Sequence, residues 1–217
     1  MNGPIKHADR SVFRAVGLAC IRRERPLFED LEFELANGGL LHINGANGSG
    51  KTSLLRILCG LLQPAAGAVE WNGMPIRSLG EEFHSHVAYL GHLNAVKDEL
   101  NASENLAYAA RLGGLACNPK EILEALDRWS LRSVTEVPCK FLSQGQKRRL
   151  GLARLTLFAS RALWVLDEPF ASLDAEGIEN VRLLIERHLG ANGMAVLTSH
   201  QLVPIEAAAL QRVELAS

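Results

Sequence analysis

A glycine-rich segment that ends in lysine and threonine constrains this chain more than any other feature. Residues 45–52 read Gly-Ala-Asn-Gly-Ser-Gly-Lys-Thr, between an apolar run, Leu40 to Ile43, and an apolar stretch, Leu54 to Leu62. The run is typical of a buried strand, and the stretch is typical of a helix. A Gly-rich loop between a strand and a helix lets backbone N–H groups approach phosphate oxygens, and the helix N-terminus favours the anion. The sequence therefore predicts a phosphate-binding loop.

We expect this loop to bind a nucleotide together with Mg²⁺. Lys51 is placed to contact the β and γ phosphates, and Thr52 is placed to ligate the metal. The candidate nucleotide-binding residues are contiguous: Asn44, Gly45, Ala46, Asn47, Gly48, Ser49, Gly50, Lys51, Thr52 and Ser53. The alternative is a chance Gly-rich turn, and the flanking strand and helix patterns argue against it.

A second apolar run ends in two acidic residues. Leu163 to Leu166 shows no polar alternation, as expected of a strand covered on both faces, and Asp167 and Glu168 follow it. We expect both carboxylates at the sheet edge that carries the phosphate loop. Asp167 is suited to hold Mg²⁺, and Glu168 is the candidate general base for an attacking water. A solvated strand end is the alternative.

A third motif marks the start of a helix. It consists of Leu142, Ser143, Gln144, Gly145 and Gln146. Ser143 is a typical N-cap, and the free N–H groups of the following helix could bind an anion. The alternative is a plain helix cap, which would explain Ser143 but little of the rest of the motif. The basic residues that follow, Lys147 to Arg149, are expected to form a solvated face.

Composition favours one domain with an apolar core. The 217 residues are 47% apolar with a formal net charge of −1, so we expect no nucleic acid partner. No apolar run approaches the roughly 18 to 20 residues of a membrane span, and the first residues do not form a secretory signal, so a cytoplasmic location is expected. The four cysteines lie far apart without a CxxC pair, which argues against disulfides and zinc.

The order of predicted elements indicates an α/β fold. An antiparallel side-sheet is expected from extended stretches at Phe13–Ile21 and Leu31–Leu35 and from a hairpin that turns at Asn72-Gly73. Helices are predicted at Ser103–Leu112, after the N-cap Asn118, and at Ala175–Leu189. We expect a single domain over residues 1–217, with a helical subdomain inserted at about 97–138.

The motifs occur in the order found in ATP-binding cassette (ABC) ATPases, which the chain resembles over about residues 12–205. Residues 142–146 resemble the family signature, Ala171-Ser172-Leu173-Asp174 resembles its D-loop, and His200 matches its switch histidine. The resemblance implies a P-loop NTPase cassette in the α/β class, with a mixed sheet core, an antiparallel side-sheet and a helical insert. Its cofactors would be ATP and Mg²⁺.

The resemblance also assigns roles. Lys51, Glu168 and His200 would be catalytic, Asp174 would belong to the D-loop, and Thr52 and Asp167 would be the metal ligands. The chain would form a head-to-tail homodimer. In it, Ser143 and Gly145 of one copy would cap the γ-phosphate held by Lys51 of the other.

Within that family the chain resembles the ATPase subunits of the haem exporter of cytochrome c maturation. The shared traits are the short length, Gly91-His92 with Lys97, Glu104-Asn105-Leu106, and residues 163–174 and 198–201. This implies a peripheral protein on the cytoplasmic face of the bacterial inner membrane, bound to integral membrane transporter subunits and linked indirectly to a haem chaperone. A transporter ATPase for another cargo is the main alternative. A soluble ABC ATPase acting on DNA or ribosomes and a catalytically silent binding module are two others.

The chain departs from the wider family pattern in two features. His92 occupies the position of the usual Q-loop glutamine, or is a polar strand-end histidine. Arg22 and Arg23 lie where an aromatic residue usually stacks on adenine. A guanidinium plane can stack on any purine, so weak base selectivity is predicted unless these arginines only face solvent.

Overall fold

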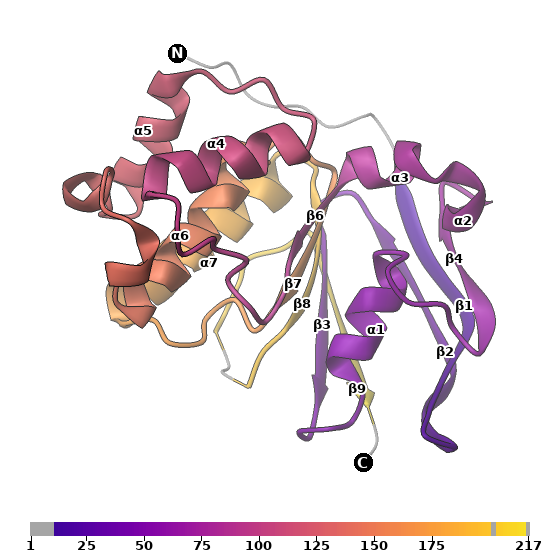
Figure 1. The fold of residues 1–217 in the computed structure, drawn as a ribbon. Coiled ribbons are helices and arrows are strands. Elements are labelled where there is room, and N and C mark those ends of the chain that lie inside the picture. Colours follow the sequence, from indigo (N-terminus) through magenta and orange to yellow (C-terminus); the bar gives the residue numbers. More distant parts are fainter. Residues whose placement is uncertain (1–10, 201–202, 216–217) are drawn as a thin grey trace.

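The structure, a computed structural model, describes residues 11–200 and 203–215. In this part of the chain the strands form two sheets (Figure 1). The first is antiparallel, in the order β2 (Arg25–Ala36), β1 (Val12–Arg22), β4 (Ala66–Trp71), β5 (Met74–Pro75). The second is parallel, in the order β6 (Val87–Leu90), β7 (Leu163–Asp167), β8 (Met194–Thr198), β3 (Gly39–Gly45), β9 (Ala209–Leu215). The core thus combines both pairing modes, as predicted.

The antiparallel sheet follows the alternation in the sequence. Leu31, Phe33 and Leu35 of β2 are buried, whereas the glutamates between them are exposed. The predicted hairpin between β4 and β5 is confirmed. Asn72 and Gly73 have φ values of 52° and 78°, and a type I′ turn requires positive φ at both central positions.

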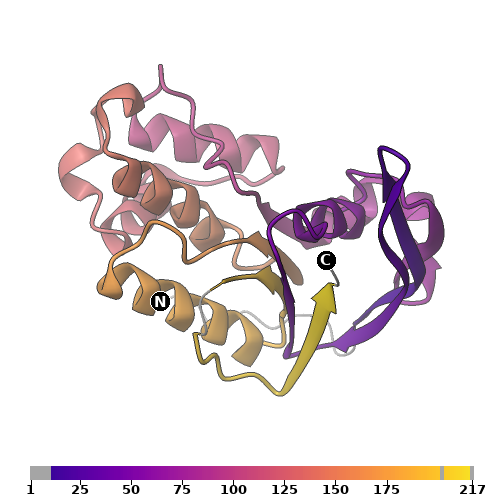
Figure 2. The same cartoon turned by 90° about the horizontal axis from the view of Figure 1, so that it is seen from below.

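The parallel sheet separates two apolar cores. Successive residues of β7 point to opposite faces: Trp164 and Leu166 lie in one core, and Leu163 and Val165 lie in the other. One core is formed with the helices α4 to α7, and the other with α1 and the antiparallel sheet (Figure 2). Because both faces are covered, the central strands need apolar residues at every position, which explains their unbroken apolar runs.

Helix α1 (Lys51–Leu58) lies between the two sheets and is shorter than predicted (Figure 1). The sequence favoured a helix up to Leu62, but Gly60 takes a φ of 72°. The Gly60 N–H donates to Ile57 O at 2.9 Å and the Leu61 N–H to Arg56 O at 2.8 Å. These two bonds form a Schellman motif, which ends the helix. Leu61 and Leu62 are consequently exposed.

Helices cover both faces of the parallel sheet. The short helices α2 (Ile76–Leu79) and α3 (Glu81–His86) contribute Ile76 and Phe83 to the core on the α1 side. The other face is covered by α4 (Ala102–Leu112), α5 (Pro119–Arg128), α6 (Gln144–Leu157) and α7 (Ala175–Gly190), with short 3₁₀ turns at Arg132–Val134 and Cys139–Phe141. The N-caps Asn101 and Asn118 each form a capping box with the glutamate three residues later. Helix α6, which follows the segment predicted as an insert, packs against both α4 and α5.

Asn105 fixes the connection from the sheet to this helical layer. This buried side chain accepts a hydrogen bond from the Lys97 N–H at 2.8 Å and donates to the carbonyls of Lys97, Leu100 and Asn101 at 3.0 to 3.2 Å. The segment before α4 is therefore held against that helix. Within the described residues no helix has the length and apolarity of a membrane span, and the four cysteines are free, as predicted.

Candidate functional site

The glycine-rich loop joins the end of β3 to the start of α1, as its sequence predicted. Gly45, Gly48 and Gly50 have φ values of 147°, 87° and 103°, a region that side chains with a Cβ rarely adopt. A Cβ on Gly45 would also lie 2.5 Å from the Oγ of Ser49. That Oγ is buried and makes no hydrogen bond within the described residues. The loop thus offers backbone N–H groups and a free hydroxyl, which fits a phosphate.

Lys51 opens α1 and folds back over the loop. Its Nζ donates to Gly45 O at 2.6 Å and to Ala46 O at 3.1 Å, and the residue is 9% exposed. The ammonium group therefore lies at the loop itself, where a phosphate would meet it.

Thr52 and Asp167 come together at the centre of the site. The Thr52 hydroxyl donates to Oδ2 of Asp167 at 2.8 Å, and the Thr198 hydroxyl donates to Oδ1 at the same distance. The Asp167 residue is 2% exposed. Hard oxygen donors of this kind suit Mg²⁺, which is usually bound by one or two protein oxygens plus substrate phosphates. The residues present fit that ion.

Glu168 and His200 also lie together. The His200 N–H donates to Oε2 of Glu168 at 3.3 Å, and Nε2 of the same histidine lies 3.4 Å from Oε1. The Glu168 N–H donates to the Thr198 hydroxyl at 3.0 Å. Thr198 therefore contacts both predicted acidic residues. No sequence motif predicted a role for Thr198, although it stands two positions before the predicted switch histidine.

The signature segment forms a separate part of the surface. Ser143 caps α6 and accepts from the Gln146 N–H at 3.1 Å, and the Gln146 side chain accepts from the Ser143 N–H at 2.9 Å. A shallow cavity of about 320 Å³ is lined by residues of the signature and the D-loop: Ser143, Gly145, Gln146, Arg149, Ser172, Leu173 and Asp174. None of these lining residues belongs to the phosphate loop.

An ion pair joins the signature helix to the D-loop. The Arg149 guanidinium contacts both carboxylate oxygens of Asp174 at 2.7 and 3.0 Å. The Gly177 N–H and then this arginine hold the pKa of the Asp174 carboxyl below its usual value. The carboxylate is thereby kept charged at the edge of the cavity.

His92 is not brought to the acidic pair. It is exposed, and it makes no hydrogen bond or ion pair with any other described residue. Its neighbour Leu93 is 82% exposed. His92 and Leu93 thus point outward, whereas Asn94 and Val96 of the same segment are partly buried.

The predicted solvated basic face is wrong for Arg148, which is 4% exposed. Its guanidinium donates to the backbone carbonyls of Asp167 and Glu168 and to Oδ1 of Asn94. Helical spacing could have revealed this position, because Arg148 lies on one face with Leu152 and Leu155, both buried. Three consecutive basic residues hid that signal.

Comparisons with known proteins place the chain in one family. The family model described as "ABC transporter" matches residues 28–171, more than half of the chain. The cytochrome c biogenesis ATP-binding export protein CcmA of Nitrosospira multiformis is 48% identical over 92% of this chain and 97% of its own length. The protein of the same name from Dechloromonas aromatica is 46% identical over 94% and 100%. The resemblance to the cytochrome c maturation ATPases is therefore confirmed.

Solved structures agree on the fold. An ATP-binding ABC transporter protein from Pyrococcus furiosus superposes with a TM-score of 0.78 at 23% identity, covering 94% of this chain and 97% of that one. The ATP-binding subunit of another ABC transporter gives a TM-score of 0.79 at 23% identity, covering 88% and 80%. The family model, the named relatives and the shared architecture agree, and this chain belongs to the ABC transporter family as one of its ATP-hydrolysing cassettes.

Proposed function

We propose that this protein is the ATP-hydrolysing subunit of an ABC transporter that serves cytochrome c maturation. The observation that carries the proposal is the meeting of Thr52, Asp167, Glu168 and His200 beside the phosphate loop. These residues come from three regions of the sequence, and their groups match the needs of phosphoanhydride hydrolysis. Relatives of nearly the same length that are named as cytochrome c biogenesis export ATPases supply the physiological context.

Each residue of the site has its own role in the proposed hydrolysis of ATP. Lys51 and the loop N–H groups bind the β and γ phosphates of ATP, and Thr52 and Asp167 hold Mg²⁺, which neutralises phosphate charge when bound. The Glu168 carboxylate accepts a proton from a water molecule as that water attacks the γ-phosphorus and the bond to the ADP oxygen breaks. His200, which contacts both Glu168 oxygens, orients that carboxylate.

The location of the signature residues, away from the phosphate loop of the same chain, supports a homodimer of ATPase subunits. Ser143 and Gly145 line a cavity that contains no phosphate-loop residue, so a protomer does not bring its own signature to its own loop. A second copy placed head to tail would bring these N–H and hydroxyl groups to the γ-phosphate. Each nucleotide would then lie between two chains, and hydrolysis would weaken the contact.

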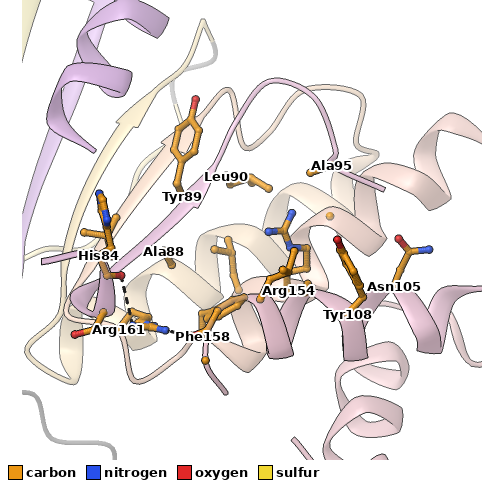
Figure 3. A pocket seen from close by; sticks show the side chains of 18 of the residues that line it. His84, Ala88, Tyr89, Leu90, Ala95, Asn105, Tyr108, Arg154, Phe158 and Arg161 are labelled. Atoms are coloured by element: carbon orange, nitrogen blue, oxygen red, sulfur yellow. Dashed lines mark hydrogen bonds between the residues drawn. The ribbon is translucent and has the colours of Figure 1, made fainter. Parts of the chain in front are cut away.

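A groove between the sheet and the helical layer is suited to a membrane subunit (Figure 3). It has a volume of about 900 Å³ and is lined by residues of α3, β6, α4, α6 and the segment before α4. Tyr108 and Leu112 supply partly exposed apolar surface there, and Lys97, Arg154 and Arg161 supply positive charge. Burial lowers the pKa of Arg154, and this side chain makes no hydrogen bond within the described residues. A segment of the membrane subunit that carries apolar side chains and a carboxylate would fit this lining.

The partners and place of action follow from that assignment. Integral membrane transporter subunits would occupy the groove, and the ATPase would work at the cytoplasmic face of the bacterial inner membrane. Its turnover would be coupled to haem export or to the release of a haem chaperone beyond the membrane. An ABC transporter for another cargo is the second candidate, because cargo is selected by chains other than this one.

The substitution Glu168→Gln tests the proposal. The amide keeps the shape of the side chain but cannot accept the proton, so hydrolysis should fall by about 10²-fold or more while ATP binding is retained. The variant should accumulate as an ATP-bound dimer in size-exclusion chromatography with light scattering. Glu29→Gln, on an exposed position of β2, is the matched control and should hydrolyse like wild type. Wild-type turnover by Glu168→Gln would contradict the assigned mechanism.

The physiological part needs a separate experiment. This chain, as wild type or as Glu168→Gln, is co-expressed with the membrane transporter subunits of its own organism. Formation of the haem-loaded periplasmic chaperone is then measured for each version. The proposal predicts that the loaded chaperone is released only with wild type. Equal release with both would assign this ATPase to another cargo.

A further inference from the structure

Arg148 lies beneath the turn that carries the predicted general base. It belongs to α6, two residues after the last residue of the signature, and is 4% exposed. One terminal nitrogen donates to the backbone carbonyl of Glu168 and lies 3.5 Å from that of Asp167. A buried guanidinium is thus placed against the main chain of both acidic residues.

The turn that Arg148 contacts has an uncommon backbone conformation. Glu168 has a φ of 49°, in the left-handed region that residues other than glycine seldom adopt. Such a conformation persists only where surrounding contacts determine it. Here the Glu168 N–H is bound by Thr198, and its carbonyl accepts from both Arg148 and the Ala171 N–H. These contacts aim the Glu168 side chain toward His200.

The other end of the guanidinium reaches the segment that leaves β6. A second terminal nitrogen donates to Oδ1 of Asn94 at 3.2 Å. Asn94 packs closely on α6, because a Cβ on Gly151 would lie 3.2 Å from the Asn94 carbonyl oxygen. The next residues, Ala95 to Lys97, line the groove described above. One side chain therefore joins that segment to the Glu168 turn.

We infer that Arg148 is a positioning residue for Glu168, and that through Asn94 it ties the orientation of the general base to the segment Gly91–Leu100. The inference deepens the proposed function and rests on the role given there to Glu168. Arg148 acts on the main chain of Glu168 and does not touch the reacting atoms. Movement of the segment at the groove would pass to the turn through a single guanidinium.

The chemistry of the guanidinium suits this role. Its planar fork of donors can bind two carbonyls and an amide oxygen at once, which a lysine ammonium on a flexible stem does less well. Burial lowers the pKa of Arg148, and the neighbouring carboxylates of Asp167 and Glu168 favour its charged form. Since guanidinium groups remain protonated in proteins, the contacts hold across the working pH range.

The test compares Arg148→Met, Arg148→Lys and Asn94→Ala in the purified full chain. Methionine keeps an apolar stem without donors, and lysine restores one donor site. Arg182→Met is the matched control, because within the described residues the ion pairs of Arg182 are with Glu179 and Glu186 on α7, away from the site. We expect Arg148→Met to lower kcat by about 10- to 100-fold with KM for ATP within about threefold of wild type, as for a misplaced catalytic group. Arg148→Lys should recover part of the loss, and Asn94→Ala should show a smaller one.

A double-substitution cycle separates positioning from general structural damage. If Arg148 acts through Glu168, Arg148→Met should add no further loss to the residual single-turnover rate of Glu168→Gln, and ATP should still bind. If the rate losses of the two single substitutions multiply in the double variant, the inference is wrong. It is also wrong if Arg148→Met hydrolyses ATP within about twofold of the wild-type rate. If Arg148→Met does not fold, the same cycle with Arg148→Lys decides. Full activity of Glu168→Gln itself would overturn the role proposed for Glu168 and this inference with it, whereas losses that multiply in the cycle overturn this inference alone.

Discussion

The Thr52 hydroxyl donates a hydrogen bond of 2.8 Å to Oδ2 of Asp167, so the start of a helix and the end of a strand 115 residues apart meet at one point. The contact exists because β7 and β3 flank β8 in a parallel sheet and present their carboxyl ends at the same edge. The two oxygens that we propose as metal ligands are thereby placed within one coordination sphere.

The substitution Asp167→Asn should weaken the binding of the Mg²⁺ that hydrolysis requires. The amide preserves shape but removes the negative charge, so the Mg²⁺ concentration for half-maximal rate should rise by about 10-fold or more. Rates measured over a Mg²⁺ titration test this, with chelation by EDTA expected to abolish wild-type turnover. Asp30→Asn is a suitable control, since Asp30 is exposed and its φ of 50° is tolerated by asparagine. An unchanged titration curve for Asp167→Asn would remove this carboxylate from the metal site.

The substitution Gly145→Asp should abolish hydrolysis without unfolding the protomer. A Cβ at Gly145 meets nothing closer than the Ser143 Oγ at 4.0 Å, so the new side chain has room in a single chain. In a dimer its carboxylate would face the γ-phosphate of the opposite copy and repel it. The melting temperature should stay near that of wild type while ATPase activity is lost.

Mixing two inactive variants tests whether the site is shared. Lys51→Ala and Gly145→Asp chains, combined in equal amounts, should recover up to about a quarter of wild-type activity, because half of the dimers are mixed and each has one intact site. A site complete within one chain would give no recovery. Activity is measured before and after mixing at the same total protein.

The stability of the fold should fall in mild acid because of His42. This β3 residue is 9% exposed, and burial lowers its pKa while a hydrogen bond with the Ser199 backbone offsets part of the effect. Below about pH 6.5 the unfolded chain takes up a proton that the folded chain does not, so protons favour unfolding. The loss is at most about 1.4 kcal/mol per pH unit until the folded pKa is reached. The melting temperature should drop less between pH 7.5 and 5.5 in His42→Gln than in wild type. Equal drops would contradict the account.

Selectivity between ATP and GTP should be low. Arg22 and Arg23 lie at the exposed turn between β1 and β2, and their guanidinium planes can stack on either purine without reading its edge. We expect kcat/KM for the two nucleotides to differ by less than about 100-fold. A larger preference for ATP would show that other groups read the base.

Local structure was largely predictable from the sequence. The phosphate loop, the type I′ turn at Asn72-Gly73, and the N-caps Asn118 and Ser143 are determined by residues a few positions apart. The unbroken apolar runs of β3 and β7 indicated strands covered on both faces, which indicated a parallel sheet. The end of α1 was mispredicted, because apolar residues after Gly60 continued the helical pattern beyond the Schellman motif.

Contacts between distant residues were decided by the tertiary structure. Nothing near Thr198 in the sequence marks it as the partner of both Asp167 and Glu168, and a run of basic residues concealed the burial of Arg148. The sequence determined which chemical groups the site contains, since motif residues carry their chemistry with them. Strand order and helix packing determined which of those groups meet, because hydrogen bonds act over about 3 Å, a range that only the folded chain brings together.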